Sequence, residues 1–128
     1  MKKTILLLIC GLAFAFNVNG NYKCLTFGVS IKRSNGEVES IKNTPKTQAL
    51  LKKSLKYLYE IKLKPLKDGL IMYVDGKEEK LQFVKEIEKG VKLYKDAKSG
   101  ALFATDSLHM QAGLNIPAKG MVIFYNCK

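Results

Sequence analysis

The sequence predicts an α+β fold: a mainly antiparallel β-sheet, shaped as a small barrel or sandwich, with one amphipathic helix near the N-terminus and a disulfide joining the two ends. Three observations lead to this prediction. Apolar and polar residues alternate in several short segments, which is typical of half-buried strands. Turn signals recur roughly every 8–12 residues, as in antiparallel sandwiches and barrels. One segment, 46–61, changes to helical spacing.

Composition indicates one globular domain with a basic surface. The chain has 128 residues, of which 47% are hydrophobic and 26% charged, a balance that argues against disorder. The net charge is +11, and Arg33 is the only arginine. Base recognition favours the planar guanidinium group. The lysines therefore indicate a solvated or generally anion-attracting surface.

Residues 1–20 have the pattern of a secretory signal peptide. A basic start precedes an apolar run, Ile5–Phe16, that is too short to span a bilayer. Cleavage is expected after residue 15 or after residue 20, leaving 21–128 as a single secreted domain. The opening resembles bacterial signals, so we expect a periplasmic or secreted bacterial protein with no transmembrane segment in its mature part.

The cysteines predict a disulfide between the two ends of the domain. Cys10 lies in the signal, and Ile9 before it lacks the small side chain that lipoprotein processing requires. Cys24 and Cys127 remain, in an oxidising setting. Their bond would contribute about 4–5 kcal/mol by restricting the unfolded chain. Two free thiols are the alternative, and a metal site is disfavoured by a single histidine and no third thiol.

The first half of the domain is expected to form a hairpin. Residues 23–33 alternate as a strand, and Asn35-Gly36 accepts the positive φ values of a tight turn. A weaker strand through Val38 and Ile41 follows. The expected buried residues of the first strand are Leu25, Phe27, Val29 and Ile31.

A helix is predicted from Lys46 to Ile61, capped by Thr44 with Pro45 at its first position. Its leucines form one stripe, which we expect to pack on the sheet. The opposite face carries Lys52, Lys53 and Lys56. The alternative function for this basic face is contact with an anionic membrane or nucleic acid.

Strand patterns fill the rest of the chain, although 59–66 fits both helical and strand spacing. Residues 70–74 are apolar on both faces, and Asp75-Gly76 predicts a turn. Further strands are expected through 80–84, on both sides of 97–99, through 108–114 and at 121–127. The residues expected to point inward in two of these strands are Leu81, Phe83, Leu108, Met110, Ala112 and Leu114.

No arrangement of residues predicts catalysis. His109, the only histidine, falls on the polar side of its expected strand, and the acidic pairs at 78–79 and 86–88 lie among lysines. The disulfide would leave no thiol nucleophile, and neither a nucleophile elbow nor a phosphate-binding glycine loop occurs. We therefore predict a non-enzymatic protein with no catalytic residues, cofactor or metal.

The remaining class is a binding protein, and its candidate loop is the Ser99-Gly100 turn in "DAKSGALF". Small polar turns enter a partner's cleft with little steric clash, although Ser-Gly also simply fills turns.

The order of short motifs carries a family resemblance. "YKC" near the start, "DGK", "SG" before an aromatic residue, "KG" and a near-terminal cysteine occur in sequence. In this the chain resembles the periplasmic and membrane-bound inhibitors of c-type lysozyme. The resemblance implies a small disulfide-tied barrel whose Ser-Gly-x-x-Tyr loop enters the lysozyme cleft. It places that loop on Ser99, Gly100 and Phe103, with phenylalanine in place of tyrosine, and the later Lys-Gly on Lys119-Gly120.

Two functions follow as hypotheses, and a third, a small hydrolase or lytic factor, would require two carboxylates brought together in a dry cleft. The first is a small exported binding protein of the bacterial envelope, in particular a lysozyme-type inhibitor whose partner is lysozyme. The alternative is a cationic envelope module that binds anionic glycan, lipid or nucleic acid.

Overall fold

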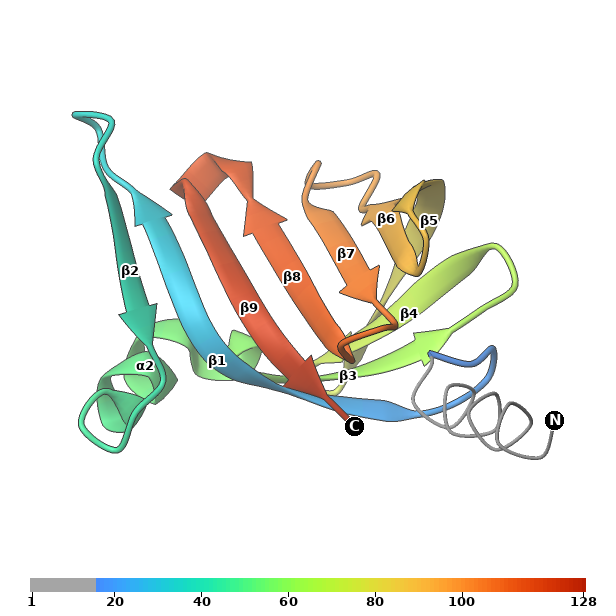
Figure 1. The fold of residues 1–128 in the computed structure, drawn as a ribbon, viewed down its shortest axis with the longest axis horizontal. Helices are drawn as coiled ribbons and strands as arrows, with labels where there is room; N and C mark the ends of the chain where they lie inside the picture. Colours follow the sequence, from blue (N-terminus) through green and yellow to red (C-terminus); the bar gives the residue numbers. More distant parts are fainter. Residues whose placement is uncertain (1–15) are drawn as a thin grey trace, which may run out of the picture.

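The computed structural model describes residues 16–128 and shows an eight-stranded antiparallel barrel (Figure 1). The antiparallel sheet is confirmed, in its barrel form. The proposed signal peptide and Cys10 lie mostly or wholly outside the described residues. The barrel strands are β1 Tyr22–Lys32, β3 Glu60–Pro65, β4 Gly69–Val74, β5 Lys77–Glu88, β6 Val91–Lys95, β7 Leu102–Asp106, β8 Gln111–Ile116 and β9 Met121–Cys127.

The strands follow an up-and-down order in which β9 returns to pair with β1. The other edge of β1 pairs with two strands, β3 and β2 (Val38–Lys42). The first part of β1, Tyr22–Leu25, pairs with β3, and its later part, Gly28–Lys32, pairs with β2. The strand β2 therefore extends the sheet beyond the barrel, at the left of Figure 1.

The expected disulfide is confirmed. Cys24 and Cys127 are direct partners in the β1–β9 ladder, and their sulfur atoms are bonded at 2.05 Å. Both side chains point into the barrel and are buried. The covalent link thus joins the two strands that close the barrel, 103 residues apart in the chain.

The barrel interior is packed with apolar side chains. The largest fully buried ones are Tyr125, Phe103, Ile61, Leu63, Leu70, Leu81 and Ile123. Buried polar groups find partners inside, as burial requires. The Tyr125 hydroxyl donates to the Leu58 carbonyl at 2.6 Å, and Thr26 Oγ1 donates to the Tyr59 carbonyl at 2.7 Å.

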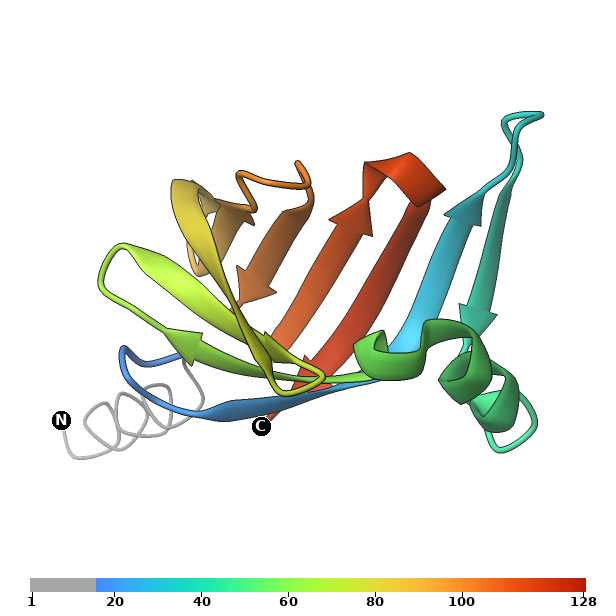
Figure 2. The ribbon, with the colours of Figure 1, turned by 180° about the vertical axis from the view of Figure 1, so that it is seen from behind.

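The expected amphipathic helix over 46–61 is wrong in length, position and character. The structure has α2 at Gln48–Leu55 and a 3-10 turn, η1, at Lys56–Leu58, placed after the β1–β2 hairpin and lying at the lower end of the sheet, on the side that faces the viewer in Figure 2. Leu51 and Leu55 are buried, but Leu50 is 56% exposed, so the helix is not clearly amphipathic.

The helix ends at Leu55, well before Ile61, and the chain then enters the barrel. Lys56 takes a positive φ of 52°, which breaks the helical path. The next carbonyls, of Leu58 and Tyr59, accept hydrogen bonds from Tyr125 and Thr26. Glu60 then pairs with Leu25, and the chain continues as β3.

The expected inward face of the first strand is also partly wrong. Cys24, Thr26 and Val29 are buried, whereas Leu25 is 43% exposed. The register slips between Thr26 and Gly28, a β-bulge that leaves Phe27 unpaired. A bulge re-aims the side chain at its extra residue. Phe27 therefore lies on the outer face of the sheet.

Two other expected inward residues differ from the prediction. Leu108 is 69% exposed and Met110 has a φ of 50°, because residues 107–110 form the turn between β7 and β8. Phe83 is 43% exposed. Leu81, Ala112 and Leu114 are buried as expected. Within the described range, no helix is long and apolar enough to span a membrane.

Candidate functional site

The Ser99-Gly100 turn is exposed and held in one shape by Asp96. It joins β6 to β7, where the Asp96 amide donates to the Ala101 carbonyl and the Gly100 amide to the Asp96 carbonyl, both at 2.9 Å. The Asp96 carboxylate accepts from Ser99 Oγ at 2.7 Å and from the Lys98 amide at 3.2 Å. The Ser99 hydrogen bond is the main cause that lowers the pKa of Asp96.

Gly100 has a φ of 75°, a conformation that other residues adopt only with strain. Apart from the residues next to it in the chain, no atom of the described residues lies within 4 Å of the position a Cβ would take there. The tip of the turn is therefore small, open and conformationally defined.

Two other residues were assigned to this loop. Lys119 lies at the same end of the barrel as the Ser99 turn, whereas Phe103 is buried. Lys119 is exposed in η2 (Pro117–Lys119), the turn between β8 and β9. This turn projects from the same end of the barrel as the Ser99 turn (Figure 1). Phe103 is 1% exposed and sits in the core opposite Tyr94. The structure thus brings the two turns to one end and separates Phe103 from them.

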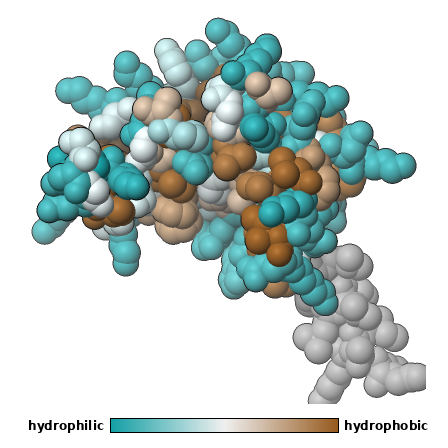
Figure 3. Space-filling view, turned by 90° about the horizontal axis from the view of Figure 1, so that it is seen from above, coloured by the Kyte–Doolittle hydropathy of each residue, from teal (hydrophilic) through white to brown (hydrophobic). Residues whose placement is uncertain are grey.

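This end of the molecule is mainly hydrophilic. Figure 3 views it from above and shows hydrophilic side chains around a group of hydrophobic ones near its middle. A partner that docks here would meet polar turns beside this apolar surface.

The basic helix face is exposed. Lys52 and Lys53 lie in the last turn of α2, and Lys56 begins η1. Lys52 Nζ stands 5.6 Å from the centroid of the Tyr59 ring, a cation–π contact that directs this lysine toward the barrel.

His109 lies in the exposed β7–β8 turn instead of a strand. Its Nδ1 is 2.6 Å from the Asp106 carboxylate, three residues earlier. This is a local turn contact. Among residues 16–128, no three His, Cys, Asp or Glu side chains gather as metal ligands would.

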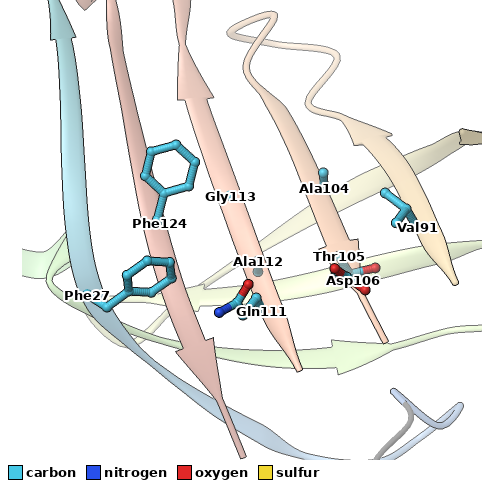
Figure 4. A pocket seen from close by; sticks show the side chains of 9 residues that line it. All are labelled: Phe27, Val91, Ala104, Thr105, Asp106, Gln111, Ala112, Gly113 and Phe124. Carbon is cyan, nitrogen blue, oxygen red and sulfur yellow. The ribbon is translucent and has the colours of Figure 1, made fainter. Parts of the chain in front are cut away.

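The sequence prediction missed an aromatic surface on the outer face of the sheet. Phe27 from the bulge and Phe124 from β9 lie with ring centroids 6.0 Å apart. Figure 4 shows them beside the small residues Gly113 and Ala104 of the next strands, with Val91 on the far side. These residues line an open hollow of about 210 Å³.

A second hollow lies on the other side of the same rings. It has a volume of about 410 Å³ and reaches Ile41 and Lys42 of β2. Alternation alone placed Phe27 inward, so only the bulge reveals this surface. One sequence signal could have corrected the assignment of Leu25. The disulfide to Cys127 requires Cys24 to face inward, and the next residue, Leu25, then faces outward.

Comparisons with protein-family models, with curated proteins and with solved structures found no significant match. The resemblance to lysozyme inhibitors therefore rests on the short motifs of the sequence.

Proposed function

We propose that the chain is a small exported, non-enzymatic binding protein of the bacterial envelope that presents the Asp96–Ala101 turn to a partner protein. One observation carries the proposal: the Asp96 carboxylate holds an exposed tip of small residues in one shape. A pre-ordered loop loses less conformational entropy on binding than a flexible one. The Cys24–Cys127 disulfide supports an oxidising, exported location.

The partner that the sequence resemblance suggests is c-type lysozyme. Ser99 and Gly100 would enter its cleft, because small side chains at a rigid tip can approach a concave surface closely. Lys119, on the adjacent turn, would contact the rim. Phe103 is buried, so it would support the hairpin from inside the barrel and would not touch lysozyme.

Titration of the exported protein against c-type lysozyme tests this proposal. We expect stoichiometric inhibition at moderate salt, where screening reduces the repulsion between two basic proteins. Ser99→Arg places a long charged side chain at the tip and should abolish inhibition. Ser34→Arg is the matched control, since Ser34 lies in the exposed β1–β2 turn at the same end.

Two results would count against the proposal. Absence of inhibition at a large molar excess would remove lysozyme as the partner. Inhibition that survives Ser99→Arg but disappears with Phe124→Ser would move the contact to the outer aromatic surface and overturn the role of the turn.

A further inference from the structure

Three lysines and a tyrosine form one continuous row on the outer face of the barrel. Lys23 is the direct partner of Lys62 in the β1–β3 ladder, and Lys62 is the direct partner of Tyr73 in the β3–β4 ladder. Lys128 continues β9 and exchanges two backbone hydrogen bonds with Lys23, at 2.9 and 3.0 Å. Direct partners share a face of a sheet, so these four side chains lie side by side.

The neighbours of this row confirm that it faces outward. Cys24, Ile61 and Met72, each adjacent in the chain to one member of the row, are buried in the barrel. Successive residues of a strand point to opposite faces. The three lysine side chains are exposed, and Tyr73 is half-buried.

The row carries three positive charges, and its acidic neighbours are Glu60 beside Lys23 and Glu78 opposite Tyr73. Lysines directly opposite each other repel, and adjacent strands are only about 4.8 Å apart. Lys23 pairs with Glu60 at 3.2 Å. Within residues 16–128, the ion pairs that the structure shows include neither Lys62 nor Lys128. An anion bound across the row would relieve this repulsion.

The row also borders a hollow of suitable size. Its volume is about 410 Å³, within the range of small-ligand sites. Asn21, Tyr22 and Tyr73 line it together with the three lysines, so it combines cationic groups, two aromatic rings and an amide that both donates and accepts hydrogen bonds.

We propose that this hollow binds an anionic saccharide. The lysine ammonium groups would hold sulfate or carboxylate substituents, the Tyr73 ring would lie against the apolar face of one sugar ring, and the Asn21 amide would bond to hydroxyl groups. The site lies on β1, β3 and β4, away from the Ser99 turn, and does not depend on the proposed function.

The lining favours a saccharide over the other polyanions. Single-stranded nucleic acid is held by several aromatic residues in succession, and an interfacial lipid site needs apolar residues that insert between acyl chains. Of the two rings in this hollow, that of Tyr22 packs edge-on against Phe16, with ring centroids 4.9 Å apart, and its hydroxyl accepts from the Asn17 amide, so Tyr73 is the ring that lies in the row of charges.

The test is a titration of the exported protein with a heparin-derived tetrasaccharide, followed by calorimetry and by NMR shifts. We expect saturable binding that shifts the Tyr73 and Lys62 resonances. The double variant Lys62→Gln with Lys128→Gln should bind at least about tenfold more weakly and show a shallower salt dependence. Tyr73→Ala should weaken binding without changing the salt dependence.

The matched control is the double variant Lys46→Gln with Lys53→Gln, which removes the same charge from exposed positions in and before α2. It should change the affinity less than twofold. Equal weakening by both double variants would show attraction to net charge alone and overturn the site. Absence of saturable binding would overturn it as well. So would equal affinity for inorganic sulfate, single-stranded DNA or anionic vesicles.

Discussion

Cys24 and Cys127 lie directly opposite each other in the ladder between the first and the last strand of the barrel. The disulfide between them therefore acts at the closure of the barrel, where a first and a last strand meet. Almost the whole described domain lies within the loop that it closes, with 103 residues of separation.

Removal of this bond should lower stability strongly. For the double variant Cys24→Ala with Cys127→Ala, we expect the free energy of unfolding to fall by about 4–5 kcal/mol, because the unfolded chain regains the entropy of a long loop. Urea denaturation measures the change, and the reduced native protein should unfold near the same midpoint. Alkylation of both cysteines in protein isolated from the envelope would contradict the bond.

The hydrogen bond from Tyr125 to Leu58 should be important for stability. Tyr125→Phe leaves a carbonyl in the interior without its partner, which should cost about 1–3 kcal/mol in urea unfolding. Tyr57→Phe is the control, since Tyr57 is 59% exposed and should change stability little. Equal stability of both variants would mean that water replaces the lost donor.

Two tyrosines should resist ionisation at high pH. Burial raises the pKa of Tyr125 and of Tyr94 above the ordinary value of a phenol. The folded state thus favours the protonated phenols. The free energy of unfolding is unaffected by them below about pH 10 and falls as the pH rises further, because the unfolded chain ionises first. Spectrophotometric titration should show tyrosine ionisation that extends above the range of a free phenol, and Tyr125→Phe should remove its last step. A titration that ends within the ordinary range while the fold is intact would contradict this.

Gly69 should be intolerant of a side chain. A Cβ at this position would lie 2.8 Å from the Leu81 carbonyl oxygen of the neighbouring strand, whereas a Cβ at Gly28 would lie 3.4 Å from the Ile41 carbonyl oxygen. Gly69→Ala should therefore destabilise the barrel by about 1–3 kcal/mol, more than Gly28→Ala does. Thermal and urea unfolding of the two variants make the comparison. The reverse order would show that β4 and β5 separate easily.

The shape of the candidate turn should depend on Ser99. Ser99→Ala removes the hydrogen bond that is the main cause of the low pKa of Asp96, so that pKa should rise toward its ordinary value. NMR titration of the Asp96 carboxyl group measures it, and the Gly100 amide should broaden as the turn loosens. Ser34→Ala, in another exposed turn, should leave the pKa of Asp96 unchanged. An unchanged pKa in Ser99→Ala would contradict the network.

Much of the barrel could be predicted from local sequence. The Asp75-Gly76 turn was predicted from two residues, and both have positive φ in the structure, 52° and 72°. The hairpin around 97–99 and the last strand follow in the same way from alternation and turn residues. Such patterns depend on the conformational preferences of residues that are neighbours in the chain. These preferences are the same in any fold that buries one face of each strand.

The candidate sites were predicted less completely. Ser99, Gly100 and Lys119 do lie on exposed turns, but Phe103, which the motif resemblance grouped with them, is in the core. Neither the outer aromatic pair nor the row of Lys23, Lys62 and Tyr73 could be recognised from the chain. The first depends on a bulge, and the second on the register of β3 with β4 and with β1, which is far from β3 in sequence.

The sequence by itself determined the strands, the tight turns and the pair of cysteines available for a disulfide. Tertiary structure decided that Phe27 points outward and that the helix stops at Leu55, because these outcomes depend on hydrogen bonds and register between distant segments. The chain leaves the helix at Lys56, where φ is 52°, and the carbonyls of Leu58 and Tyr59 then accept hydrogen bonds from Tyr125 and Thr26 of the barrel.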